Sequence, residues 1–120
     1  MILPSDFDFT LSVQEDIYVI RLNFTRATLK EAAKFKEIVN MAFIQKYRKF
    51  IIDLDDVSFI DSTFLGVLVW AQKKLSTQEG EMTLIGIDKD IYTIIGAMNL
   101  IKLFKISDNM ESAVNYLSTK

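Results

Sequence analysis

The stretch FIIDLDDVSFIDSTFLGVLV (residues 50–69) begins as a hydrophobic strand and ends as an apolar helix. Residues 50–54, FIIDL, form the nearly continuous apolar run that is typical of a strand buried on both faces. Asp61, Ser62 and Thr63 follow, and residues of these types favour helix N-termini. The stretch therefore predicts a buried strand at residues 50–54, a loop, and a helix over residues 62–75.

Patterns on both sides of this stretch alternate between strand and helix signals. Thr28 and Glu31 form a capping-box pattern at the start of one of the expected helices. The expected strands are residues 7–13 and 17–22 (a hairpin), 50–54, 82–87, and a short edge strand at 103–106. The expected helices are residues 29–43, 62–75, 88–97 with Asp88 as cap, and 109–117 framed by Asp108 and Glu111. This order predicts an α/β fold, with one domain over residues 1–120 and a mixed four- to five-stranded sheet whose helices pack mainly on one face.

Composition narrows the classes of function. The 120 residues contain 14 Lys and Arg and 16 Asp and Glu, so the net charge is −2, and the cations are scattered. A dedicated nucleic-acid site is therefore not expected, because nucleic-acid affinity depends on massed cations. Cys and His are absent. Their absence removes thiolate and imidazole metal ligands together with Ser-His and Cys-His nucleophiles. The set of possible catalytic side chains is therefore small, and we expect no cofactor.

The ends and the apolar runs of the chain suggest where the protein resides. No signal-peptide pattern opens the sequence, and a cysteine-free chain suits the cytosol. The longest apolar run, residues 64–71, is far short of the ~20 residues that cross a membrane. A cytoplasmic protein without a membrane span is the expectation.

An acidic cluster precedes the second helix and has two interpretations. Asp53, Asp55, Asp56 and Asp61 could bind a divalent cation with their carboxylates. Alternatively, Asp55 and Asp56 are loop carboxylates and Asp61 caps the helix. The second interpretation needs no ion, and it is the one we adopt.

The hydroxyl groups at the start of this helix also have two interpretations. Asp61 or Ser62 could serve as the N-cap. Alternatively, Ser62 or Thr63 could carry a phosphate, which the free N–H groups and the dipole of a helix N-terminus would stabilise. Such a phosphate would add about −1.5 to −2 charge beside Asp61. It could block an interface and leave the fold intact.

The apolar helix has a second side that carries Trp70. At 100° per residue, Trp70 falls near Gly66, Lys73 and Lys74, away from the core-facing stripe. Trp is enriched among the residues that dominate binding energy at interfaces. Trp70 is therefore either an interface anchor or a residue packed under a neighbouring helix, and the sequence leaves both open.

The motif at residues 53–66, DLDDVSFIDSTFLG, resembles that of STAS domains, in particular the anti-sigma factor antagonists. The family pattern is Asp-Leu-x-x-Val-x-Phe/Tyr-hydrophobic-Asp-Ser-Ser/Thr-Gly-Leu-Gly. Residues 99–106, NLIKLFKI, followed by Asp108 and Ala113, also look like the C-terminal segment of the family. The resemblance extends from near the start of the chain to Leu117.

The resemblance implies a regulatory module without catalysis of its own. In the family, the Ser after the motif Asp is phosphorylated by an anti-sigma factor kinase, and the unphosphorylated form binds that partner. By position, Ser62 is the implied phosphorylation site and Thr63 the secondary one. Asp61, Ser62, Thr63, Phe64 and Trp70 are the expected partner-binding residues.

Two departures from the family pattern bear on partner binding. Phe64 replaces a Gly that lets a partner approach closely, and we expect its large side chain at the mouth of the helix. Residues 23–27, NFTRA, replace a Gly-Glu-hydrophobic-Asp turn that contributes to partner binding in the family.

Two further hypotheses remain beside the phosphorylation switch. The chain could be an unphosphorylated STAS subunit of a larger scaffold or transport assembly, with Phe64 and Trp70 as constant interface residues. A weaker hypothesis is a nucleotide or other small ligand near the loop of residues 55–62.

Overall fold

The computed structural model describes residues 1–4 and 6–120. Its main sheet has the strand order β1-β2-β4-β6-β7, in which β1 is antiparallel to β2 and the other neighbours are parallel. The strands are β1 (Phe9–Gln14), β2 (Ile17–Leu22), β4 (Lys49–Asp53), β6 (Glu81–Ile85) and β7 (Lys105–Ile106). A second, two-stranded parallel sheet pairs β3 (Arg26–Ala27) with β5 (Phe59–Ile60). The predicted α/β class and the mixed sheet are confirmed.

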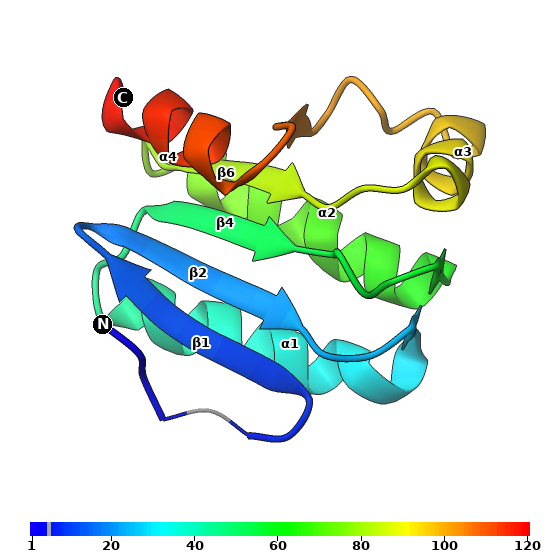
Figure 1. The fold of residues 1–120 in the computed structure, drawn as a ribbon, viewed down its shortest axis with the longest axis horizontal. Helices are drawn as coiled ribbons and strands as arrows, with labels where there is room; N and C mark the ends of the chain where they lie inside the picture. The colour runs from blue at the N-terminus through cyan, green and yellow to red at the C-terminus, as the bar shows by residue number, and fades with distance from the viewer. Residues whose placement is uncertain (5) are drawn as a thin grey trace.

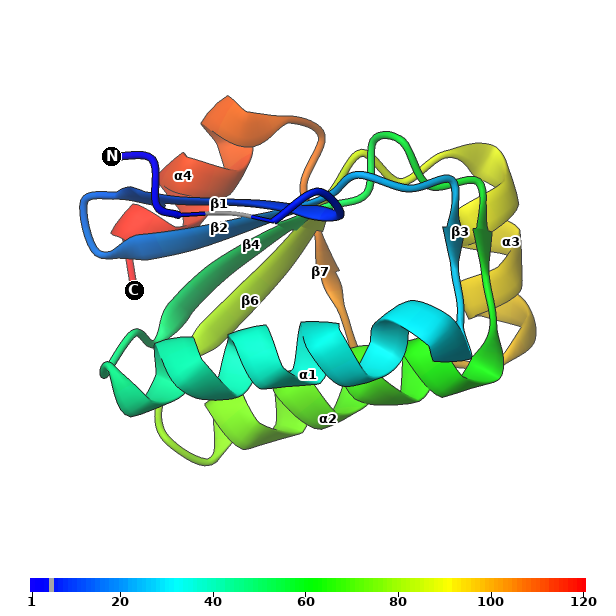
Figure 2. The same cartoon turned by 90° about the horizontal axis from the view of Figure 1, so that it is seen from below.

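Four helices complete the described part of the chain: α1 (Leu29–Ile44), α2 (Ser62–Ser76), α3 (Lys89–Ala97) and α4 (Met110–Ser118). Helices α1 and α2 cover one face of the sheet and α4 covers the other, while α3 lies beside the β3–β5 pair (Figure 1, Figure 2). None of the described helices is long and apolar enough to cross a membrane.

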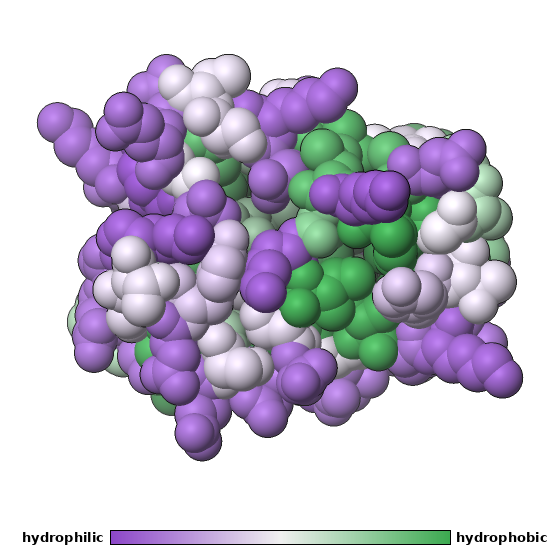
Figure 3. Space-filling view, turned by 90° about the horizontal axis from the view of Figure 1, so that it is seen from above, coloured by the Kyte–Doolittle hydropathy of each residue, from purple (hydrophilic) through white to green (hydrophobic). Residues whose placement is uncertain are grey.

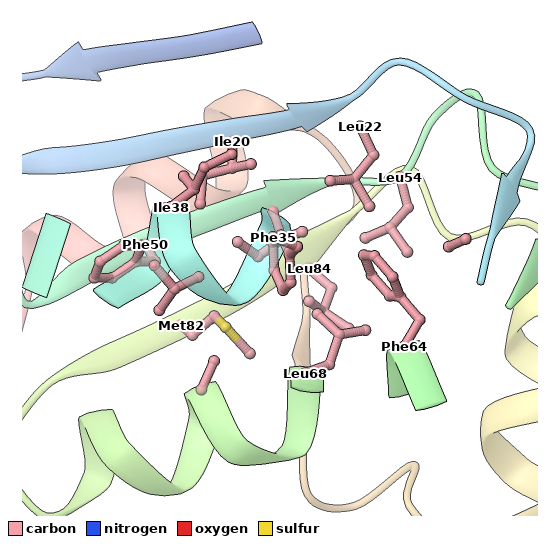
Figure 4. Packing of buried hydrophobic residues seen from close by; sticks show 14 of the residues in the cluster. Ile20, Leu22, Phe35, Ile38, Phe50, Leu54, Phe64, Leu68, Met82 and Leu84 are labelled. Atoms are coloured by element: carbon pink, nitrogen blue, oxygen red, sulfur yellow. The ribbon is translucent and has the colours of Figure 1, made fainter. Parts of the chain in front are cut away.

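The central strands are hydrophobic on both sides because both faces of the sheet are covered. In β4, Phe50 and Ile52 face the large core under α1 and α2, while Ile51 faces the smaller core under α4. Figure 4 shows side chains of the large core pointing toward one another from the sheet and from both helices. The two-sided burial predicted for residues 50–54 is thus confirmed, and it fixes where the loop toward α2 leaves the sheet.

Several predicted boundaries differ from the structure. The first strand begins at Phe9, because Phe7 is 92% exposed and outside the sheet. The strand expected at residues 103–106 is reduced to the two residues of β7. The last helix is capped by Asn109, whose side chain accepts from the Ser112 N–H in a capping box, and not by Asp108. Strands β3 and β5 were not expected, because two-residue strands carry no periodicity.

Candidate functional site

The β3–β5 pair places the first turns of α1 and α2 side by side. Ala27 in β3 is the register partner of Ile60 in β5, and each strand leads almost directly into a helix. The Asp61 N–H donates to the Ala27 carbonyl at 2.9 Å, which continues the pairing up to the helix start. Both helices run in the same direction from this point (Figure 2). Two helix N-termini therefore lie next to each other at one end of the molecule.

Asp61 bridges these two N-termini with its carboxylate. Its Oδ1 accepts from the Phe64 N–H at 2.8 Å and caps α2. Its Oδ2 accepts from the Leu29 N–H at 2.8 Å, at the first residue of α1. Each helix end carries a partial positive charge of about half an elementary charge, so a carboxylate between two of them is favourably placed. The interpretation of Asp61 as a cap is confirmed, and the structure extends it to two helices.

Capping by Asp61 leaves the neighbouring hydroxyl groups exposed. Ser62 and Thr63 are the first two residues of α2, and both are exposed. Among residues 1–4 and 6–120, their hydroxyl groups and backbone N–H groups form no hydrogen bond with another protein atom. A cap and a modifiable hydroxyl can therefore both be present at this helix start. Asp61 is the cap, and the hydroxyl group of Ser62 is free to be modified.

Three carboxylates of the acidic cluster surround one arginine of the neighbouring strand, which offsets part of their charge. The Arg21 guanidinium contacts Asp53 at 2.9 Å, Asp56 at 3.1 Å and Asp55 at 4.0 Å. Burial alone would lower the pKa of Arg21, but the three carboxylates, Asp53 above all, raise it. Within the described residues no cluster of acidic side chains is arranged to hold a metal ion. The loop interpretation of this cluster fits better than a cation site.

Phe64 does not lie at the mouth of the helix. Its side chain is fully buried and stacks on Phe35 at 5.0 Å between ring centroids, with Phe24 edge-on at 6.1 Å (Figure 4). The expectation that this side chain contacts a partner is wrong, because residue 64 lies on the side of α2 that faces the sheet. Phe64 fills the core beneath the first turn of α2.

Trp70 lies farther along α2, apart from the Ser62 end. It is partly buried and lies eight positions after Ser62, about 12 Å along the helix axis. Asp61, Ser62 and Thr63 thus form one cluster, and Trp70 belongs to a different part of the surface.

Leu29 is a site residue that sequence reasoning missed. It starts α1 beside Asp61, and its side chain is 69% exposed. The capping-box pattern at Thr28 and Glu31 placed Leu29 at a helix start. Only the pairing of β3 with β5 places that start next to Ser62.

Apolar surface adjoins this end of the molecule. Helix α3 packs beside β5, and Tyr92 and Met98 on or next to it are about half exposed. Tyr92, Gly96, Asn99, Ile101 and Lys102 line a hollow of about 340 Å³. Figure 3 shows apolar surface gathered on the half of the molecule where α3 lies.

Comparison with known proteins gives a consistent family. Residues 5–113 match the model of the STAS domain. The anti-sigma-B factor antagonist of Listeria monocytogenes is 32% identical over 84 residues, 70% of this chain and 73% of that protein. A crystal structure from Thermotoga maritima, described as a candidate anti-sigma factor antagonist, superposes with a TM-score of 0.85 at 28% identity, over 92% of this chain and 94% of that one.

A more distant structure shares the fold alone. The unphosphorylated form of the anti-sigma factor antagonist SpoIIAA has a TM-score of 0.74 at 19% identity, over 93% of this chain and 99% of that chain. The family match spans nearly the whole sequence, and the fold superposes on both of these structures. The chain therefore belongs to the STAS domain family.

Proposed function

We propose that the chain is a regulatory module that binds an anti-sigma factor and is switched by phosphorylation of Ser62. The observation that carries the proposal is that the hydroxyl group of Ser62 is exposed and forms no hydrogen bond in the described part of the chain, because Asp61 already caps α2. The anti-sigma-B factor antagonist named among the relatives supports the partner class. An anti-sigma factor with serine kinase activity would be both the partner and the modifying enzyme.

The electrostatics of the site suit a phosphate on Ser62. The backbone N–H groups of Ser62 and Thr63 are unpaired within the described residues, and the dipoles of α1 and α2 both direct positive potential to this end. The fold would tolerate the modification, because the hydroxyl holds no structural contact. The surface would change, because a dianion would stand beside the carboxylate of Asp61.

The surroundings of Ser62 suit a protein partner. Leu29 is exposed on one side of the paired helix starts, and the apolar surface of α3 lies at the same end. A partner that covers these side chains would enclose Ser62 at the contact. A phosphate there must keep its hydration shell, so it would oppose the docking.

The test is phosphate mapping. The purified chain is incubated with the anti-sigma factor kinase of its own organism and ATP, and modified peptides are identified by mass spectrometry. We expect phosphate on Ser62, with loss of most modification in Ser62→Ala. Persistent modification of a Ser62→Ala, Thr63→Ala double variant would overturn the assignment of the site.

A second candidate function is that of a constant, unphosphorylated subunit of a larger assembly. The half-exposed Tyr92 and Met98 favour it, because large apolar side chains at a surface are often covered by another chain. Co-purification of the tagged chain separates the two functions. A stoichiometric partner that remains bound to Ser62→Asp would support the constant subunit and contradict the switch.

A further inference from the structure

Basic and aromatic side chains form a continuous strip along the pair of helices α1 and α2. We call it the basic aromatic strip, and its members are Lys36, Phe43, Arg48, Trp70, Lys73 and Lys74. Helix α2 contributes the last three of these residues, and α1 contributes Lys36 and Phe43. Arg48 lies just beyond the end of α1. The two helices form the outer layer on their side of the sheet (Figure 2).

Cation–π contacts link five members of the strip, and Lys73 adjoins Lys74 in sequence. The Lys36 Nζ lies 4.9 Å from the centroid of the Trp70 ring. The Lys74 Nζ lies 5.6 Å from the same ring and 4.4 Å from that of Phe43. The Arg48 guanidinium lies 3.7 Å from the Phe43 ring. Such contacts hold the cations in place and leave their charge available.

The positive charge of the strip is not balanced by carboxylates. In the described part of the chain, ion pairs are formed by Arg21, Lys34 and Lys49, and by none of the four strip cations. Lys73 and Lys74 lie in the last turn of α2, where the helix dipole accounts for part of their placement. Lys36 lies in the middle of α1, and no helix end explains it. The strip is thus a positive surface on a chain of net charge −2.

A shallow hollow of about 470 Å³ lies within the strip. Its lining is Gly66, Val69, Trp70, Lys73, Lys74 and Thr77. Val69 and Trp70 are partly buried and supply apolar surface, while the two lysines supply positive charge at its rim. A Cβ added at Gly66 would meet no atom within 4 Å, so the hollow is open above that residue.

We propose that the basic aromatic strip is a docking surface for an acidic segment of a partner protein. An apolar side chain of that segment would sit in the hollow against Val69 and Trp70. Its flanking carboxylates would pair with Lys36, Lys73 and Lys74. The proposal rests on charge complementarity and on the apolar surface of the hollow. It does not depend on phosphorylation of Ser62, which lies at the other end of α2.

The aromatic rings of the strip argue for a protein segment over a nucleic acid. Single-stranded nucleic acids gain affinity by stacking bases on open aromatic faces. Two cations already lie over Trp70, and two lie over Phe43. The surface offers carboxylates the three lysines named above, and cations already occupy positions over both rings on which a base could stack.

Trp70 supplies the assay, because it is the single tryptophan of the chain. The probe is a tryptophan-free helical peptide with Leu on one face and Glu on the other, titrated into the full chain at low salt. The matched peptide has Gln in place of every Glu. We expect a saturable change in Trp70 fluorescence with the Glu peptide, weakening with added salt, and none with the Gln peptide.

Charge variants test where the peptide binds. The variant Lys36→Gln, Lys73→Gln removes two exposed cations of the strip, and we expect its affinity for the Glu peptide to fall about tenfold. The control, Lys89→Gln, Lys102→Gln, removes the same charge elsewhere and should keep the affinity.

Three results would overturn the proposal. The first is equal binding of the Glu and Gln peptides, or binding of neither. The second is an equal loss of affinity in the two double variants. The third is tighter binding of single-stranded DNA or of phosphatidylglycerol vesicles than of the Glu peptide, which would assign the strip to a different class of partner. The Ser62→Asp variant should bind the Glu peptide with the same affinity as the unsubstituted chain. A failure of the docking proposal is therefore distinguishable from a failure of the proposed Ser62 switch.

Discussion

Replacement of Asp61 should destabilise the fold more than the loss of an ordinary helix cap. Loss of an N-cap side chain costs about 0.5–2 kcal/mol. Asp61 also accepts from the Leu29 N–H at 2.8 Å, and losing this second, charge-assisted bond at a partly exposed site adds about 1 kcal/mol. We therefore expect Asp61→Ala to lower the free energy of unfolding by about 2–3 kcal/mol, because both helix starts lose their acceptor at once.

The chain contains a matched control for this experiment. Asp88 caps α3 through one bond, to the Ile91 N–H at 2.8 Å, so Asp88→Ala should cost about 1 kcal/mol. Asp61→Asn should fall between the two, since its amide can accept from Phe64 but its NH₂ group cannot accept from Leu29. Urea unfolding followed by circular dichroism gives all three values. If Asp61→Ala costs no more than Asp88→Ala, the two-helix bridge is refuted.

Three further predictions concern the core, the alkaline limit and a tight turn. Phe64→Ala should cost about 3–5 kcal/mol in urea unfolding, because it empties a fully buried position, and a cost below 1 kcal/mol would show a surface side chain. The pKa values of Tyr18 and Tyr116 are raised, mainly by burial. The folded state thus holds these phenol protons more tightly, and stability present below about pH 10 should decline as pH rises through the folded pKa values; Tyr18→Phe should reduce that decline in unfolding curves. Gly86→Ala should be strongly destabilising in the same assay, because Gly86 has φ +72° and a Cβ there would lie 2.5 Å from the Asp55 nitrogen; a neutral effect would contradict this geometry.

The sequence predicted those helices and strands whose hydrophobic pattern extends over several consecutive residues. The strand near residues 50–54 follows from a nearly continuous apolar run, and α1 follows from hydrophobic periodicity. Helix α2 follows from cap-forming residues before an apolar stretch, and the Thr28–Glu31 capping box is present in the structure. Strands β3 and β5 have two residues each, too few for any period, and their pairing depends on contacts between distant segments. Hence the order of the longer elements was predictable, and the contact between the two helix starts was not.

The same limit applies to the candidate site. Asp61, Ser62 and Thr63 are adjacent in sequence, so their meeting at a helix start could be predicted. The burial of Phe64 depends on which side of α2 faces the sheet. The family pattern has Gly at this position, and that comparison led us to expect the Phe64 side chain at the surface. The neutralisation of Asp53 by Arg21 joins residues 32 positions apart through the β2–β4 pairing, which local sequence does not encode.

The switch proposed for Ser62 is tested most directly by calorimetric titration of the proposed anti-sigma factor partner. The titrant is the chain in two forms: unmodified, and carrying phosphoserine at position 62. We expect the unmodified chain to bind and phosphorylation to weaken binding by about a hundredfold or more, since a hydrated dianion would have to enter the contact. Equal affinity of the two forms would contradict the assignment of Ser62 as the switch.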